Sequence, residues 1–245
     1  MAMEIHKVKS GIPGLDRMLG GGFIKNSVIA LAGETGSGRT IFASQFLIKG
    51  ATDYGEPGLF LSFDEQKNTI YANLASFGWD LMSLEREQKV VFIEYPQNEL
   101  SSFVEQEGAI RDLISTLGIR RIVVDSITPY SLLFSGNEER QMNTLKLVSA
   151  VRGWKVTAML CSEATQSHEH SVPHTISVVE SFADGFIHLS FMRREGRRER
   201  AVEIVKMRGC RHEHEIRPAE IMDKGFAVGI APEGKKAAKP KGAMQ

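Results

Sequence analysis

The sequence contains little cysteine and no long apolar run. Its two cysteines, Cys161 and Cys210, lie far apart and outside any spacing that is typical of a metal site. This usage predicts reduced thiols and argues against a structural disulfide. No stretch approaches the roughly 20 apolar residues of a membrane span, and the N-terminal residues contain no apolar signal core. We therefore expect a cytoplasmic protein without a membrane span.

An excess of charge of either sign is also missing. The 30 lysines and arginines balance the 30 aspartates and glutamates, so the chain as a whole has no electrostatic bias toward nucleic acid or a membrane surface. The exception is local, because residues 231–245 are rich in proline, glycine, alanine and lysine. We expect a single domain over residues 1–230 and a disordered basic tail over residues 231–245, which is either merely solvated or a contact arm.

The stretch Gly33–Thr40, which reads Gly-Glu-Thr-Gly-Ser-Gly-Arg-Thr, carries the clearest motif. It follows an apolar run at residues 27–31 and precedes a helical pattern at residues 41–49. This is the setting of a phosphate-binding loop, or P-loop, whose backbone N–H groups and following helix cradle phosphates. Thr40 occupies the position whose hydroxyl coordinates Mg²⁺, and Arg39 occupies the usual lysine position.

Apolar runs alternate with helical patterns before and after this loop. The runs are residues 27–31, 59–63, 90–93, 122–124 and 156–161. One helical pattern is formed by Ile70, Leu74, Phe77 and Leu81. Continuous apolar strands that alternate with amphipathic helices predict an α/β fold with a mainly parallel sheet that helices cover on both faces.

The C-terminal part of the chain follows a different pattern. Residues 186–192 and 200–207 flank a polar turn at residues 193–199, which predicts an antiparallel hairpin that extends the sheet. In a strand, Lys206 and Arg208 point to the same face. Two cations on one face could reach phosphates, although a basic edge strand also serves to discourage aggregation.

Three acidic residues follow apolar runs. Asp125 comes directly after residues 122–124, and Asp64 and Glu65 come after residues 59–63. Ligands of open α/β sheets bind at the carboxyl ends of the strands, where these acids are expected to lie. Asp125 fits the Walker B position toward Mg²⁺, and Glu65 fits a carboxylate that activates water. The alternative for the pair at 64 and 65 is the acidic first turn of a helix.

Arg39 is the one departure from the P-loop pattern. Arginine can bind phosphates through its planar fork, but it is longer than lysine and does not place a compact charge at the same point. By the precedent of oxyanion holes, losing a group placed to stabilise charge slows catalysis about 10²–10³-fold. We therefore expect nucleotide binding with slow or conditional hydrolysis, unless Arg39 replaces lysine adequately.

The motifs, taken in order, resemble the KaiC-like branch of the RecA-type ATPases. The landmarks are residues 10–16, 19–22, 33–40, 63–65, 76–81, 123–126 and 206–212. The resemblance covers roughly Val8 to Ile230. It implies a RecA-like P-loop fold, the cofactors ATP and Mg²⁺, and a homohexameric ring with ATP between subunits. A regulatory protein partner is possible but not named by any motif.

The resemblance also implies a role for particular residues. Glu65 matches the catalytic glutamate, with Asp64 beside it, and Asp125 matches the Walker B acid that accompanies Thr40 at Mg²⁺. The residues implied to contact ATP within the same chain are Gly33, Thr35, Gly36, Ser37, Gly38, Arg39, Thr40, Ile41, Ser76 and Phe77. The residues implied to reach the ATP of the adjacent subunit are Lys206, Met207, Arg208, Cys210, His212 and Asp223. Glu163 falls where related proteins often carry a polar residue that senses the γ-phosphate.

Three functions remain open at this point. The first is an ATPase that hydrolyses ATP at subunit interfaces, and the second is a regulatory scaffold that binds ATP with negligible hydrolysis. The third is a DNA recombination or repair mediator, which only the shared fold supports. The segment Gln166–Thr175, which corresponds to a DNA-contacting loop in recombinases, contains no lysine, arginine or aromatic residue, and this composition argues against nucleic acid.

Overall fold

A nine-stranded sheet forms the centre of the structure. The computed structural model describes residues 5–165, 173–194 and 196–229, so the expected basic tail and most of the segment Gln166–Thr175 lie outside the described residues. The strand order is β11-β10-β9-β8-β3-β7-β6-β4-β5. The strands are β3 (Val28–Gly33), β4 (Gly58–Ser62), β5 (Val90–Glu94), β6 (Arg121–Asp125), β7 (Thr157–Glu163), β8 (Gly185–Arg194), β9 (Arg197–Met207), β10 (Arg217–Met222) and β11 (Gly225–Val228).

The sheet is parallel from β5 to β8 and antiparallel from β8 to β11. The expectation of a mainly parallel sheet with an antiparallel extension is therefore confirmed. A separate pair, β1 (Lys7–Val8) and β2 (Phe23–Ile24), lies outside this sheet. The parallel arrangement brings the C-terminal ends of β3, β4, β6 and β7 to one edge, where ligands of such sheets bind.

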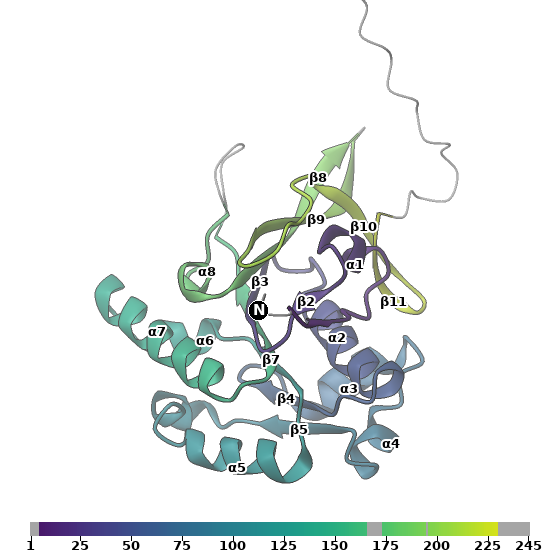
Figure 1. Ribbon diagram of the computed structural model, residues 1–245. Helices are drawn as coiled ribbons and strands as arrows, with labels where there is room; N and C mark the ends of the chain where they lie inside the picture. The colour runs from purple at the N-terminus through teal and green to yellow at the C-terminus, as the bar shows by residue number, and fades with distance from the viewer. Residues whose placement is uncertain (1–4, 166–172, 195, 230–245) are drawn as a thin grey trace, which may run out of the picture.

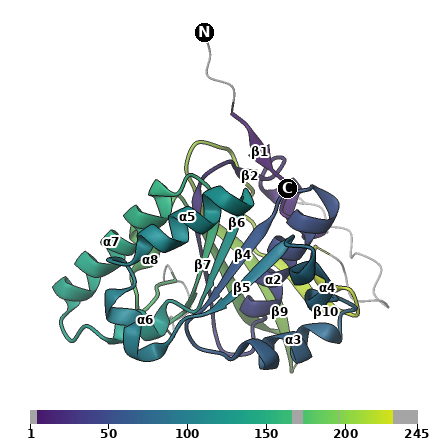
Figure 2. The same cartoon turned by 90° about the horizontal axis from the view of Figure 1, so that it is seen from below.

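Helices cover both faces of the sheet, as Figure 2 shows from below. The helices are α1 (Leu15–Met18), α2 (Arg39–Asp53), α3 (Lys67–Ala75), α4 (Leu81–Arg86), the 3₁₀ helix η1 (Gln97–Ser102), α5 (Glu107–Leu117), α6 (Thr128–Leu132), α7 (Asn137–Gly153) and α8 (Val179–Phe182). Helices α2, α3 and α4 lie on one face, and α5, α6 and α7 lie on the other (Figures 1 and 2). Along β3 the side chains alternate between the two layers, because Ile29 and Leu31 belong to one core and Val28 and Ala30 to the other.

One expected helix is two helices in the structure. The pattern from Ile70 to Leu81 predicted continuous helical spacing, but α3 ends at Ala75 and α4 begins at Leu81. Gly78 has φ +74°, a left-handed conformation that interrupts a helix. Asp80 then caps the new helix by accepting a hydrogen bond from the Ser83 N–H at 3.0 Å.

The hairpin is longer than the sequence pattern predicted. Residues 193–199 were expected to form its turn, but β8 continues to Arg194 and β9 begins at Arg197. Polar side chains on both strands concealed this length, because this part of the hairpin does not alternate between apolar and polar residues. Figure 1 shows the hairpin projecting beyond the body of the sheet.

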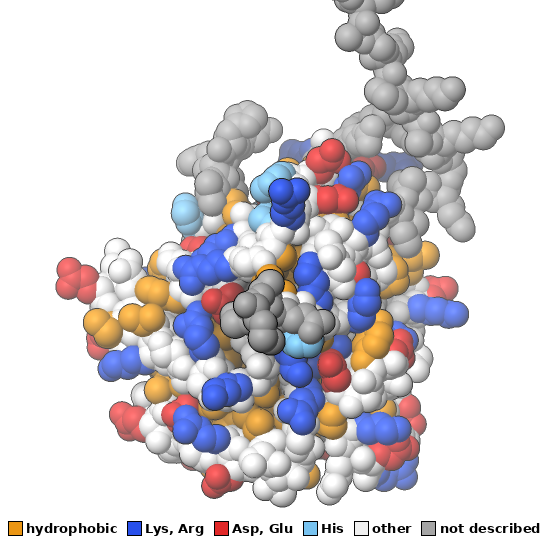
Figure 3. All heavy atoms as spheres, viewed as in Figure 1, with side chains coloured by type: hydrophobic (Ala, Val, Ile, Leu, Met, Phe, Trp, Pro, Cys, Tyr) orange, Lys and Arg blue, Asp and Glu red, His pale blue; other side chains and the backbone are white. Residues whose placement is uncertain are grey.

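The surface carries both signs of charge, as the balanced composition implies. In Figure 3, blue and red side chains are interspersed over the visible face. Hydrophobic side chains gather at its left edge, over α7. Met142 and Leu145 of α7 are exposed, as are Leu132 and Leu133 at the end of α6. Among the described residues, no helix has the length and hydropathy that crossing a membrane requires.

Candidate nucleotide site

The stretch Gly33–Thr40 forms a tight loop between β3 and α2. Gly36 and Gly38 have φ of +80° and +98°, which residues with a side chain rarely adopt. A Cβ atom on Gly33 would lie 2.8 Å from the carbonyl oxygen of Leu189, so β8 packs too closely for any side chain there. The backbone of the loop therefore leads directly into the N-terminus of α2, a helix of 15 residues. A helix N-terminus favours anions.

Thr40 and Asp125 meet at the end of the loop. The Thr40 Oγ1 hydroxyl donates to Asp125 Oδ2 at 2.7 Å. Burial raises the pKa of the Asp125 carboxyl, while the hydrogen bond from Thr40 and the charge of Arg39 act in the opposite direction. A hydroxyl and a carboxylate are hard oxygen ligands, which Mg²⁺ prefers. These two residues thus fit the metal position that the sequence predicted for them.

Arg39 has a buried nitrogen that the protein leaves unpaired. Its Nη1 has no hydrogen-bond partner within the part of the chain that the structure describes, and the same is true of the buried Ser37 Oγ. Leaving a buried donor unpaired costs about 1–3 kcal/mol, and more when the group is charged. Arg39 also lines the cavity at this loop, so its unpaired donor fits a site whose missing partner is an anion such as a nucleotide's phosphates.

A cavity of about 630 Å³ opens from this loop. Its lining includes Gly36, Gly38, Arg39, Thr40, Ile41, Glu65, Ser76, Phe77 and Arg200. The structure therefore brings Glu65 from the end of β4, and Ser76 and Phe77 from the end of α3, to the same cavity as the P-loop. A volume of this size is typical of a small-molecule site. Phe77 supplies an aromatic surface that a nucleotide base could contact.

Glu65 lies in a negative environment. Partial desolvation and the charges of Asp125 and Asp64 raise the pKa of the Glu65 carboxyl. A raised pKa moves a carboxylate toward the range that suits a general base. Asp64 is exposed and is not among the residues that line the cavity, so it acts on the site through its charge.

Glu163 stands beside the P-loop, at the end of β7. It is aligned with Gly33 across the sheet, and its Oε1 accepts a hydrogen bond from Thr35 Oγ1 at 2.9 Å. This carboxylate therefore occupies the edge of the loop where the resemblance implied a γ-phosphate sensor. Thr35 itself is exposed.

Two arginines at the site were missed by the sequence reasoning. Arg200 Nη2 donates to the Gly36 carbonyl oxygen at 3.1 Å, and Arg198 Nη2 donates to Glu34 Oε2 at 3.3 Å. The Arg200 Nε is buried and has no partner among the described residues. The sequence shows only that these two arginines are two residues apart on one strand. The register of β9 in the sheet is needed to show that they lie at the P-loop.

Six predicted residues are not brought to the P-loop of their own chain. Lys206 is aligned with Phe186, which is aligned with Ala30 in β3. The Arg208 N–H donates to the carbonyl of Asp184, the residue before β8, whose own N–H donates to the carbonyl of Val28 at the start of β3. Along the strand direction, Lys206 lies about 10 Å and Arg208 about 16 Å from the level of Gly33, and β9 is two strands away from β3. Met207, Cys210 and His212 lie close to them in sequence, and Asp223 lines a different cavity of about 350 Å³.

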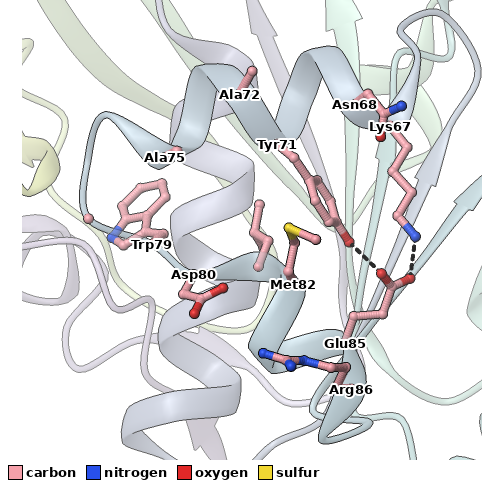
Figure 4. A pocket seen from close by; sticks show the side chains of 12 residues that line it. Lys67, Asn68, Tyr71, Ala72, Ala75, Trp79, Asp80, Met82, Glu85 and Arg86 are labelled. Carbon is pink, nitrogen blue, oxygen red and sulfur yellow. Dashed lines mark hydrogen bonds and ion pairs between the residues drawn. The ribbon is translucent and has the colours of Figure 1, made fainter.

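A larger cavity lies on the other side of α3. Its volume is about 980 Å³, and Tyr71, Trp79, Met82 and Glu85 are among its lining residues (Figure 4). Lys67 Nζ donates to Glu85 Oε1 at 2.6 Å and Tyr71 donates to Glu85 Oε2 at 3.2 Å, so its main charges neutralise one another. It contains no part of the P-loop, and the smaller cavity is therefore the candidate nucleotide site.

The chain matches the family model described as "ATPase: KaiC" over residues 8–233. The chain belongs to the KaiC family. It is 31% identical over 237 residues to a UPF0273 protein of Methanocaldococcus jannaschii, covering 91% of this chain and 96% of the relative. It is 32% identical over 234 residues to the circadian clock protein KaiC3 of Synechocystis, covering 92% of this chain but 46% of that protein.

The KaiC family is also recognised at the level of structure. A crystal structure of a KaiC-like protein of Pyrococcus horikoshii aligns with a TM-score of 0.80 and 33% identity, covering 92% of this chain and 99% of the other. The RecA-like expectation for the fold is thereby confirmed. Membership of an ATPase family supports an ATP-binding function for the cavity at the P-loop.

Proposed function

We propose that the protein binds MgATP at the P-loop and hydrolyses it, with each site completed by an adjacent subunit of a homo-oligomer, as in a hexameric ring. The observation that carries the proposal is that Arg39 lines the cavity together with Thr40 and Glu65, while its buried Nη1 finds no partner in the part of the chain that the structure describes. An anion in this cavity would satisfy the guanidinium group and the N-terminus of α2 together.

The residues of one chain would divide the work. The loop N–H groups, Ser37 and Arg39 would hold the phosphates, and Phe77 would contact the adenine. Glu65 would take a proton from the attacking water, because its raised pKa makes it a stronger base than an ordinary glutamate. Thr40 and Asp125 would hold Mg²⁺, which when bound offsets phosphate charge and so lowers the barrier to phosphoryl transfer.

The second subunit would supply Lys206, Arg208 and His212. Their absence from the lining of the P-loop cavity of their own chain supports this, and Lys206 and Arg208 lie about 10 and 16 Å along the strand direction from the level of Gly33. Both ring nitrogens of His212 are buried without a partner, as far as the described part of the chain shows. We further propose that Met207, Cys210 and Asp223 contact the same neighbouring nucleotide.

Phosphate release and molar mass test this function on one sample. With MgATP, the protein is expected to release phosphate above the level of a Glu65→Gln variant, and light scattering is expected to show a multiple of 27.2 kDa. Equal phosphate release by the two proteins would mean that Glu65 does not activate water. If the protein hydrolyses ATP but stays monomeric in its presence, the site is not completed by an adjacent subunit.

Arg39 favours one competing function, a nucleotide-dependent scaffold. Arginine binds phosphates well but places its charge differently from lysine during phosphoryl transfer. A scaffold would bind ATP and assemble without measurable phosphate release. Comparison of wild type with Arg39→Lys separates the two functions, since a scaffold gains hydrolysis only in the variant, whereas an ATPase hydrolyses in both.

A further inference from the structure

A chain of buried hydroxyl groups begins at the edge of the P-loop. Thr128 Oγ1 accepts a hydrogen bond from the N–H of Glu163 at 2.9 Å, and the Glu163 side chain in turn accepts from Thr35 of the P-loop. The same Thr128 hydroxyl lies 3.5 Å from Ser162 Oγ. Thr128 and Ser162 are both buried, so this contact lies inside the protein, next to the edge of the P-loop where the γ-phosphate is expected.

The hydroxyl chain ends at α8. Ser162 Oγ lies 2.8 Å from Ser177 Oγ, which lies 3.0 Å from Thr175 Oγ1, and Thr175 donates to the carboxylate of Glu180. The backbone carbonyl of Glu180 then accepts a hydrogen bond from Lys206 Nζ at 2.9 Å. The path therefore joins a subunit's own P-loop edge to the lysine that it would present to its neighbour.

The carboxylate fixes the direction of donation along this path. An ionised carboxylate only accepts, so the hydroxyl proton of Thr175 is committed to Glu180. Ser177 then donates to Thr175, and Ser162 donates to Ser177. Ser177 and Ser162 are completely buried, and Thr175 and Glu180 are nearly so. A fully satisfied buried network of this kind fixes one geometry of the groups that form it.

A second carboxylate holds Arg208 from the same segment. Asp184 Oδ1 lies 3.8 Å from Arg208 Nη1 and accepts from Arg152 Nη2 at 3.1 Å. Its other oxygen accepts from the N–H of Val28 at 3.0 Å, at the start of β3. The segment from Thr175 to Asp184 is therefore the support for both cations, and Thr175 ties that support to β7.

We propose that Thr175, Ser177 and Glu180 are positioning residues that set Lys206 for the nucleotide of the adjacent subunit, linking each subunit's own P-loop edge to the cation that it presents. The inference rests on the proposed function, because it requires that Lys206 acts on a neighbour. It assigns a role to side chains that touch neither the cavity nor the phosphates. It predicts that a change in this hydroxyl chain impairs the neighbouring site more than the subunit's own site.

Mixed oligomers separate these two sites. A donor subunit that carries Glu65→Gln cannot hydrolyse its own ATP but still presents Lys206. An acceptor subunit that carries Lys206→Ala has an intact P-loop but presents no lysine. In an equal mixture with MgATP, phosphate release is expected to exceed the release by either variant alone, because donors complete the sites of acceptors.

Thr175 of the hydroxyl chain is then substituted either in the donor subunit or in the acceptor subunit. Thr175→Val keeps the shape of the side chain and removes the hydroxyl. Added to the donor, it is expected to lower phosphate release by the mixture about tenfold, since a small misplacement of a positioned group has a large effect on rate. Added to the acceptor, it is expected to lower release by less than twofold. Thr175→Ser in the donor, which keeps the hydroxyl, is expected to preserve the rate.

Thr144 provides the matched control. Its Oγ1 is buried in α7 without a partner among the described residues, so Thr144→Val in the donor is expected to leave the mixture unchanged. Circular dichroism checks folding, and Ser177→Ala replaces Thr175→Val if the latter fails to assemble. No gain of activity on mixing the two parent variants would overturn the proposed function and this inference with it. A gain on mixing that Thr175→Val lowers equally from either side, or from neither, would overturn this inference alone.

Discussion

Among single residues, Arg39 is the one on which the proposed chemistry most depends. Its Nη1 is unpaired in the described structure, and its charge acts on the nearby Asp125 carboxyl. We expect Arg39→Lys to raise the rate of phosphate release about tenfold, because a lysine places a compact charge beside the transferring phosphate. Steady-state phosphate release at saturating MgATP measures this. A rate at or below that of wild type would show that arginine is the better residue here.

The pKa of Glu65 is expected to set the acid side of the pH–rate profile. A general base must be ionised, so activity falls as the pH drops through its pKa, and desolvation with the charges of Asp125 and Asp64 raises that pKa. The acid limb is expected above the ordinary glutamate value of 4.5. In Asp64→Asn, which removes one of the negative charges, the limb is expected to move to lower pH. An acid limb at the same pH in both proteins would exclude this electrostatic coupling.

The strands of the parallel sheet were predictable from sequence because burial on both faces leaves continuous apolar runs. The hairpin was less predictable, since Arg193–Arg200 is polar on both strands, and the positions of Arg198 and Arg200 at the P-loop depend on strand register. The break between α3 and α4 depends on the left-handed conformation of Gly78. Glu65, Ser76 and Phe77 could be placed at the P-loop cavity from their motifs, and the structure brings them there.

Strand β8 contains a histidine that predicts how stability depends on pH. Burial lowers the pKa of His188 from 6.5 to about 4. The unfolded chain therefore binds a proton near pH 6.5 that the folded protein does not bind until about pH 4, so the free energy of unfolding falls as the pH drops through this window. The loss is at most about 3 kcal/mol.

Urea unfolding at pH 7.5 and 4.5 measures this dependence. In His188→Gln, which has no titrating ring, the difference in unfolding free energy between the two pH values is expected to be smaller than in wild type. Carboxyl groups titrate in both proteins, so the comparison isolates the histidine. An equal difference in the two proteins would mean that His188 is protonated in the folded state.

At the scale of the whole molecule, Arg121 joins the sheet to the far end of α2. Its side chain is completely buried, with Nε donating to Glu56 Oε2 at 2.6 Å and Nη1 donating to the carbonyl of Phe46 at 2.7 Å. Its guanidinium also lies over the Phe46 ring, 4.6 Å from the centroid. This contact holds the end of α2 that is remote from the P-loop.

Removing one partner of this pair is expected to destabilise the fold without touching the site. Glu56→Gln leaves the buried guanidinium of Arg121 without its counter-charge, which costs about 3 kcal/mol in comparable buried pairs. Urea unfolding measures this loss, and the affinity for MgATP at a temperature where both proteins are folded is expected to be unchanged. A loss of unfolding free energy below about 0.5 kcal/mol would mean that water at the partly exposed position 56 already screens the charge of Arg121.

The proposed function depends on Arg39 holding nucleotide phosphates at the P-loop. Titration calorimetry of MgATP into wild type and Arg39→Ala measures this contribution, with Thr144→Val as a control that removes a buried group elsewhere. We expect at least a tenfold weaker affinity in Arg39→Ala and an unchanged affinity in the control, because the charge-assisted hydrogen bonds to phosphate are lost. Equal affinities of Arg39→Ala and wild type would show that Arg39 does not hold the phosphates.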